Sequence, residues 1–113
     1  HFIPAGRRPT NPSELLMRNS FAALLRRLSP RYDLVVIDSP PILAVTDAAI
    51  IGHHAGTNLL VVRFGLNHSR EVEMAMQRLQ QSGVEVSGVV FNGMEKRSGG
   101  YSPYGYFGYG TEA

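Results

Sequence analysis

The chain of 113 residues is 43% hydrophobic, 18% charged and 9% aromatic, with no cysteine and a formal net charge of +2 at pH 7. This composition excludes a fully disordered chain, collagen-like and coiled-coil architectures, a disulfide framework and a thiolate metal site. No apolar run approaches the about 18 residues of a membrane-spanning helix, and so small a net charge does not indicate nucleic acid as a partner.

The sequence begins with a loop and a helix. Residues 1–10 are rich in turn-forming side chains, and because the first residue is not methionine we interpret the chain as a piece of a longer protein. Asn11, Pro12 and Glu14 stand at the cap, first-turn and capping-box positions of a helix start. The apolar residues that follow at helical spacing are Leu15, Phe21, Leu24, Leu25 and Leu28. The pattern predicts one helix that Pro30 ends.

A continuous apolar run, YDLVVID, occupies residues 32–38 and ends in an acid. Such a run is typical of a parallel strand that is covered on both faces. The next three residues, Ser39, Pro40 and Pro41, break the pattern. We therefore predict a buried strand followed by a stiff loop.

Helical and strand patterns alternate through the rest of the chain. We expect a short helix over 46–54 starting at Thr46 or Asp47, a strand over 58–64, a helix from Asn67 or Ser69 to Ser82 before Gly83, and a strand over 86–91. The buried stripe expected of the longer helix is Val72, Met76 and Leu79.

This alternation predicts an α/β fold with a parallel sheet flanked by helices, built from residues 1–97. Three strands leave two exposed sheet edges, so we expect further strands, most simply N-terminal ones. The remaining residues, 98–113, read SGGYSPYGYFGYGTEA and show no periodic pattern. Their composition predicts a flexible aromatic tail.

Four of the five tyrosines lie in that tail: Tyr101, Tyr104, Tyr106 and Tyr109. The tail has three interpretations, namely disordered filler, an aromatic segment that binds partners, or a set of phosphorylation sites. Four phosphates would change the net charge from +2 to about −4 to −6. A change of that size is large enough to switch an electrostatic association.

Asp38 is the residue that points most directly to chemistry. Ligands of open α/β sheets bind beyond the carboxyl ends of the strands, and Asp38 stands at that end of the most apolar run. Three apolar residues before an acid match the Walker B pattern, in which the carboxylate positions Mg²⁺ on nucleotide phosphates. The alternative is a helix-capping or turn acid after a buried strand.

A nucleotide site also needs a phosphate-binding loop of the pattern G-x-x-x-x-G-K-[ST]. The sequence contains no such loop, and its only lysine is Lys96. If Asp38 binds Mg²⁺ with a nucleotide, that loop and its lysine are expected upstream of His1.

Asn92 follows the last predicted strand, on the same predicted sheet edge as Asp38. Its amide can read the edge of a nucleotide base, or it can be a turn residue before Gly93. The sequence leaves both interpretations open.

Four stretches closely resemble the C-terminal half of the bacterial tyrosine kinases of the Wzc type. They are GRRPTNPSELL, YDLVVIDSPPILAVTDAAIIG, LLVVRFGLNHSREVEMAMQRLQQSGVEVSGVVFNGM and the tyrosine-rich end, which together cover nearly the whole chain. NPSELL and VVIDSPP are the specific ones. The resemblance implies a partial P-loop NTPase fold of the MinD/ParA class with a flexible Tyr/Gly-rich C-terminal tail.

The resemblance also implies a function. In this family the kinase is the cytoplasmic C-terminal domain of an inner-membrane polysaccharide co-polymerase, which controls capsular polysaccharide or exopolysaccharide polymerisation and export. The chain would be part of an ATP-dependent protein-tyrosine autokinase, a transferase, with ATP and Mg²⁺ as cofactors. Implied partners are its own copies in a homo-oligomer, a cognate tyrosine phosphatase and the export machinery. The membrane would be reached only through an absent N-terminal region.

By position, the resemblance makes Asp38 the catalytic Walker B acid, which orders Mg²⁺ through water. It makes Tyr101, Tyr104, Tyr106 and Tyr109 an autophosphorylation cluster that enters a neighbouring subunit's active site. It places Asn92 near the adenine and the helix start at 11–16 near a subunit contact. Ser39 replaces the commoner threonine, and Tyr106 with Phe107 changes the tail spacing. The Walker A loop, a second acidic motif and an oligomerisation helix are missing, so this piece is not expected to catalyse alone.

Two alternative functions stay open at this level. One is an ATPase switch of the MinD/ParA kind, against which NPSELL and the tyrosine tail argue. The other is a non-catalytic regulatory module whose aromatic tail binds partners.

Overall fold

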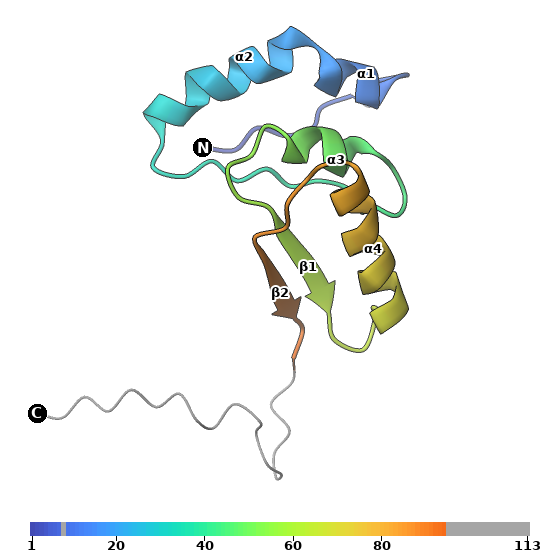
Figure 1. Cartoon of the computed structure of the whole chain (residues 1–113). Coiled ribbons are helices and arrows are strands. Elements are labelled where there is room, and N and C mark those ends of the chain that lie inside the picture. Colours follow the sequence, from blue (N-terminus) through green and yellow to red (C-terminus); the bar gives the residue numbers. More distant parts are fainter. Residues whose placement is uncertain (8, 95–113) are drawn as a thin grey trace, which may run out of the picture.

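The computed structural model describes residues 1–7 and 9–94, so the predicted tail and its tyrosines, Tyr101, Tyr104, Tyr106 and Tyr109, lie outside the described residues. In chain order the elements are α1 (Pro12–Met17), α2 (Asn19–Leu28), the 3₁₀ helix η1 (Ser29–Arg31), α3 (Asp47–Gly52), β1 (Leu59–Arg63), α4 (Ser69–Gln81) and β2 (Gly88–Asn92). In Figure 1, α4 runs beside the sheet, while α1 and α2 lie above α3.

The sheet is a parallel pair of strands joined by a helical crossover. Leu59 lies opposite Gly88 and Arg63 opposite Asn92, and α4 connects β1 to β2. Parallel neighbours require such a crossover, because a tight hairpin can join only antiparallel strands. The arrangement confirms the predicted α/β class with a parallel sheet flanked by helices, and the predicted strand bounds of 58–64 and 86–91 are close to those observed.

Asn58 ties the ends of three elements together. Its side-chain Nδ2 donates to the carbonyl oxygen of Gly52 at 3.3 Å and to that of Glu85 at 3.1 Å. Its own carbonyl oxygen accepts from the N–H of Ser87 at 2.8 Å. Because these bonds join the end of α3 and the approach to β2 to the start of β1, α3, β1 and β2 are fixed relative to one another; the Gly52 carbonyl also accepts from the N–H of Ala55 at 3.3 Å.

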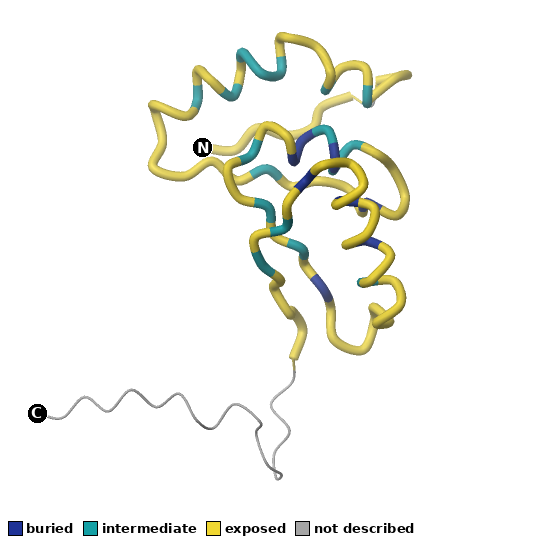
Figure 2. The backbone as a smooth tube through the Cα atoms, in the orientation of Figure 1, coloured by how far each residue is buried: buried dark blue, intermediate teal, exposed yellow. Residues whose placement is uncertain are grey.

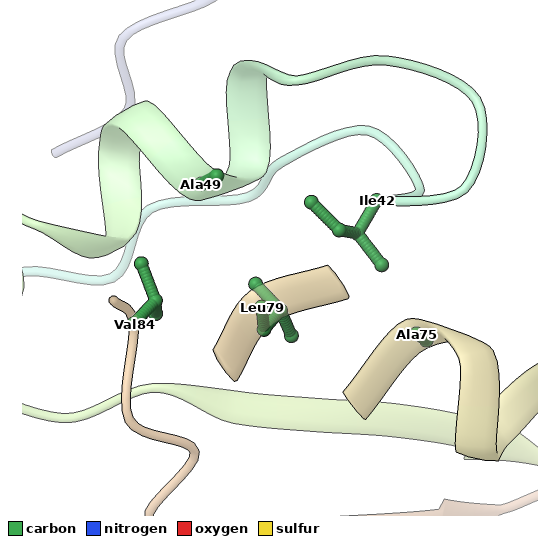
Figure 3. Close-up of a cluster of buried hydrophobic side chains, with 5 residues drawn as sticks. All are labelled: Ile42, Ala49, Ala75, Leu79 and Val84. Atoms are coloured by element: carbon green, nitrogen blue, oxygen red, sulfur yellow. The ribbon is translucent and has the colours of Figure 1, made fainter. Parts of the chain in front are cut away.

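The hydrophobic core lies between α3, α4 and the segment that leads into β2. Its buried residues are Ile42, Ala49, Ala75, Leu79 and Val84, whose side chains converge in Figure 3. The predicted helix stripe is right at Leu79 but wrong at Met76, which is 36% exposed, because the buried position one turn before Leu79 is Ala75. The methyl group of Ala75 lets α4 approach the core closely.

The C-terminal end of α4 is capped at Gly83, as the sequence predicts. Gly83 has a φ of +74°, a backbone conformation that glycine adopts without steric cost. Its N–H donates to the carbonyl of Gln80, and the N–H of Val84 donates to that of Leu79, both at 2.9 Å. This pair of bonds is a Schellman motif, and its accompanying apolar contact joins Val84 to Leu79 in the core.

The single helix predicted between Asn11 and Pro30 is wrong, because the chain breaks it into α1 and α2. Arg18 has an extended backbone, with a ψ of 148°, and separates the two helices. Asn19 and Ser20, which follow it, have side chains that compete for backbone hydrogen bonds and favour helix starts over helix interiors. α1 is bound to α3, because Ser13 Oγ donates a hydrogen bond to Asp47 Oδ1 of α3 at 2.7 Å.

The predicted buried strand over 32–38 is not formed either. The segment carries no strand pairing, and Leu34 and Val36 are 77% and 80% exposed. Figure 2 shows this stretch, between η1 and α3, as almost continuously exposed backbone. An apolar run becomes a strand only where a neighbouring strand accepts its hydrogen bonds, and the described residues place none beside it.

Candidate functional site

Asp38 lies exposed at the end of the extended segment, where it borders a broad open hollow of about 1460 Å³. The hollow is bounded by residues 32–44 on one side and by β1 and α4 on the other. Further polar residues that line it include Asp33, Ser39, Asn58, Asn67 and Glu71. The structure thus places the predicted acid beside a space large enough for a ligand, with uncharged polar groups and two further carboxylates around it.

The loop after Asp38 is a turn with defined hydrogen bonds. The N–H groups of Ala44 and Val45 donate to the carbonyl of Pro41 at 3.0 and 3.3 Å. Arg78 of α4 reaches the same loop, and its Nη1 donates to the carbonyls of Ile42 and Leu43, both at 3.1 Å. The backbone beyond Asp38 is therefore anchored both by its own turn and by a side chain of α4.

The carboxylate of Asp38 has the chemistry that a magnesium ion prefers. Mg²⁺ in nucleotide sites is held by one or two carboxylates, the substrate phosphates and several waters, and an exposed carboxylate beside an open hollow is compatible with that arrangement. Across residues 1–7 and 9–94 there is no group of three or more histidine, cysteine, aspartate and glutamate residues that could hold a metal.

Asn92 is separated from the hollow. Its side-chain Oδ1 accepts from the N–H of Gly93 at 2.8 Å, and its carbonyl accepts from the N–H of Phe64 at 2.9 Å. Asn92 Oδ1 is thus engaged by the residue that follows it, and both interpretations left open above stay open. The predicted common edge with Asp38 is absent from the described structure, because residues 32–38 are not a strand of the sheet. The adenine contact stays a prediction.

The start of α4 differs from the prediction in the roles of Asn67 and His68. We expected Asn67 or Ser69 to cap α4, but the N-cap is His68, whose N–H donates to Glu71 Oε2 at 3.0 Å. Asn67 Oδ1 instead accepts from the N–H of Arg63 at 2.9 Å and closes the turn after β1. The glutamate three residues after His68 is the sequence signal that could have located this cap.

No protein-family model matches the chain. Curated relatives do match it. The chain is 54% identical over 107 residues to the tyrosine-protein kinase Wzc of Salmonella typhimurium and 53% identical over 96 residues to the tyrosine-protein kinase Etk of Escherichia coli K12. It is 48% identical over 97 residues to a putative tyrosine-protein kinase in the cps region of Klebsiella pneumoniae. These matches cover 95%, 85% and 86% of the chain but only 15%, 13% and 13% of those proteins.

Solved structures agree with these relatives. The kinase domain of Escherichia coli Etk superposes with a TM-score of 0.77 at 52% identity, covering 89% of this chain and 40% of that domain. The BceF tyrosine kinase domain gives a TM-score of 0.71 at 53% identity, covering 79% and 37%. Over the residues matched, fold and sequence are both similar to part of bacterial tyrosine-kinase domains. More particularly, the chain is homologous to the Wzc and Etk tyrosine-protein kinases.

None of the helices in the described part of the chain combines the length and the apolar character that crossing a membrane requires.

Proposed function

We propose that the chain forms part of an ATP-dependent protein-tyrosine autokinase that acts in the production and export of capsular polysaccharide or exopolysaccharide. The observation that carries the proposal is the placement of Asp38, the acid of the VVIDSPP stretch, at the border of an open hollow. High identity to named tyrosine-protein kinases, one of them in a cps region, supports the activity and the setting.

The chemistry demands more than an acceptor. A tyrosine hydroxyl has a pKa of about 10 and is a weak nucleophile at neutral pH. The site must hold it in line with the γ-phosphate and balance the phosphate charge. Asp38 would hold Mg²⁺ through water, and the ion when bound supplies that charge neutralisation. Tyr101, Tyr104, Tyr106 and Tyr109 would be the acceptors, presented to the active site of a neighbouring copy.

The remaining machinery would come from outside these 113 residues. The sequence has no phosphate-binding loop, and the hollow beside Asp38 is wide and open. The hollow is flanked by largely exposed apolar side chains: Leu34 and Val36 on one side, and Leu59 and Val61 of β1 on the other. An exposed apolar patch of this kind is typical of a surface that another part of a protein covers. The rest of a kinase domain, carrying the Walker A loop and a second acidic motif, would provide both the cover and the lysine.

Further parts of the proposal follow from the relatives. The working assembly would be a homo-oligomer that phosphorylates itself between copies, with a cognate tyrosine phosphatase and the export machinery as partners. Its place would be the cytoplasmic face of the bacterial inner membrane, reached through another part of the protein. Asn92 would lie near the adenine once residues 32–38 join the sheet.

The test replaces Asp38 in a complete kinase that carries these residues. Asp38→Asn is nearly isosteric and removes the charge that would hold the ion, so autophosphorylation is expected to disappear while the melting temperature stays unchanged. Asp33→Asn is the matched control, because Asp33 is an exposed acid that lies on the same extended segment and lines the same hollow but does not follow the apolar VVI run. Normal phosphotyrosine in the Asp38→Asn protein would overturn the assignment. Detecting phosphotyrosine at all separates a kinase from an ATPase switch or a non-catalytic module.

A second test addresses the acceptors. Four closely spaced tyrosines can accept phosphate in several combinations, so each single Tyr→Phe change is expected to be mild and the fourfold change severe. Because each phosphate adds roughly −1.5 to −2 charges, subunit association should weaken in steps with phosphate number. Oligomer size and polysaccharide output across the series measure this. One tyrosine that accounts for the whole effect would contradict it.

A further inference from the structure

Arg78 makes side-chain hydrogen bonds to the loop that follows Asp38. Between Asp38 and the start of α3, within the part of the chain that the structure describes, the side-chain hydrogen bonds come from Arg78 Nη1 to the carbonyls of Ile42 and Leu43, both at 3.1 Å. These carbonyls lie four and five residues after Asp38. A guanidinium donor bonds carbonyl oxygens more strongly than a neutral donor does.

Arg78 is itself held in place by its helix. Its carbonyl accepts from Ser82 Oγ at 2.8 Å and from the N–H of Ser82 at 3.1 Å. The neighbouring residue Leu79 is buried in the core, as is Ile42 of the loop. The cation therefore projects from a fixed point of α4 to a backbone that is fixed at Ile42 and exposed at Asp38.

We propose that Arg78 is a positioning residue for Asp38. Its two bonds set the backbone just beyond the two prolines, so that Asp38 is already held at the border of the hollow before Mg²⁺ and nucleotide bind. The inference rests on the proposed role of Asp38 as the magnesium acid. Without Arg78, the loop has to be ordered when the ion binds, and this ordering weakens the binding.

The expected consequence is a higher magnesium requirement. Partners that orient a metal-binding group change metal affinity by about 10- to 100-fold. Because the hydrogen bonds of Arg78 lie near the surface, we expect the lower end of that range. In a complete kinase, Arg78→Met keeps the aliphatic stem and removes both bonds. The Mg²⁺ concentration for half-maximal autophosphorylation should rise about tenfold, with the rate at saturating Mg²⁺ little changed. Arg78→Lys can donate to one carbonyl and should restore part of the affinity.

Arg70→Met is the matched control, because Arg70 is an exposed arginine of the same helix near its other end. It should leave the magnesium titration unchanged. A second readout needs no catalysis: hydrogen exchange of the Ala44 and Val45 amides, which donate to Pro41. Their protection should fall in Arg78→Met and not in Arg70→Met, with the protection of α4 unaltered in both.

The outcomes separate this inference from the proposed function. If Asp38→Asn abolishes phosphorylation and Arg78→Met has a normal magnesium titration, the positioning role is overturned and the kinase assignment stands. If Asp38→Asn stays active, the positioning role of Arg78 and the assignment of Asp38 as the magnesium acid are both overturned. If Arg78→Met lowers the saturated rate and the melting temperature together, and Arg78→Lys recovers neither magnesium affinity nor exchange protection, Arg78 is merely structural and the inference is wrong.

Discussion

Two regions of this chain contain similar apolar sequences and reach opposite degrees of burial. The C-terminal region, residues 42–94, holds every buried residue of the described structure: Ile42, Ala49, Ile51, Gly52, Val62, Ala75, Leu79 and Val84. The N-terminal region, residues 1–41, holds none among those described, although it contains the VVI run. The difference is one of neighbours, since an apolar side chain is buried only where another element covers it.

β1 and residues 32–38 show this contrast most directly. β1 reads LLVVR and is paired, because α4 returns the chain so that β2 can lie beside it. Residues 32–38 read YDLVVID and have no strand beside them. The C-terminal region pairs its own two strands through the α4 crossover, although Leu59 and Val61 of β1 stay 60% exposed, whereas residues 32–38 have no partner strand among the described residues.

The largest expected effect separates two leucines. Leu79→Ala, in the core at 8% exposure, should lower the free energy of unfolding of the 113-residue chain by about 2–5 kcal/mol, because it leaves a cavity between α3 and α4. Leu34→Ala, at 77% exposure, should change it by less than about 0.5 kcal/mol. Urea unfolding followed by circular dichroism measures both. Equal losses for the two variants would refute the division into a packed and an uncovered region.

The same leucine pair sharpens the comparison in a complete kinase. If the remaining part of the domain covers residues 32–38, Leu34→Ala there should cost about 2 kcal/mol or more, while the cost of Leu79→Ala should be unchanged. Thermal unfolding of the two variants in the longer protein tests this. A Leu34→Ala variant as stable as the parent would mean that the run stays uncovered.

The next effect concerns a glycine whose position leaves no room for a side chain. A Cβ on Gly52 would lie 2.7 Å from Val84 Cγ1 and 3.3 Å from Asn58 Oδ1, so Gly52→Ala forces the core apart. We expect a loss of about 1–3 kcal/mol from this overpacking. Gly56→Ala is the control, because its Cβ would meet nothing within 4 Å. Chemical denaturation should show a neutral or slightly stabilised Gly56→Ala, and a stable Gly52→Ala protein would disprove the close contact.

A smaller effect is expected at Asn58, which connects α3, β1 and β2. Asn58→Asp replaces the Nδ2 donor with an oxygen and so faces the carbonyls of Gly52 and Glu85 with a second acceptor. The loss should be about 1–2 kcal/mol, because the Glu85 carbonyl loses its Nδ2 donor and the Gly52 carbonyl keeps only the N–H of Ala55. Asn19→Asp, at the exposed start of α2, is the control and should be neutral or slightly favourable, because a negative charge suits a helix N-terminus. Identical denaturation midpoints for the two variants would contradict the bracing role.

The sequence was a good guide where structure is local. Gly83 predicted the end of α4, and Thr46 or Asp47 the start of α3, which has Thr46 as its N-cap, because a helix end is decided by a few adjacent residues. It was a poor guide where the outcome depends on distant neighbours. Residues 32–38 needed a partner strand, and Arg18 breaks a helix whose first part is tied to α3 through Ser13.

In the candidate site, too, a residue marked by a local signal was predicted and one defined by a long-range contact was not. Asp38 was found from its position after an apolar run, which is a local signal. Arg78 was not, because a single arginine on a helix carries no sign that it will reach the carbonyls of a loop about 35 residues earlier in the chain. Contacts of this kind follow only from the packing of α4 against the core.

The smallest effect is an expected absence of change, and it tests whether the 113-residue chain makes a nucleotide site without a cover over its N-terminal region. Saturating ATP with Mg²⁺ should leave the melting temperature of the 113-residue chain unchanged. Asp38 supplies one exposed carboxylate, and the sequence has no phosphate-binding loop and no lysine besides Lys96. Most of the binding energy for a triphosphate comes from such loops and their charges.

A ligand present at about 100 times its dissociation constant stabilises the state that binds it by about 2.7 kcal/mol, which thermal unfolding resolves easily. A complete kinase in the same buffer is the positive control and should shift clearly, while its Asp38→Asn variant should lose the magnesium-dependent part of that shift. Micromolar binding of ATP by the 113-residue chain, seen by calorimetry, would show that the hollow beside Asp38 is already a working site. The N-terminal region would then need no cover to act, and the contrast between the two regions would concern stability alone.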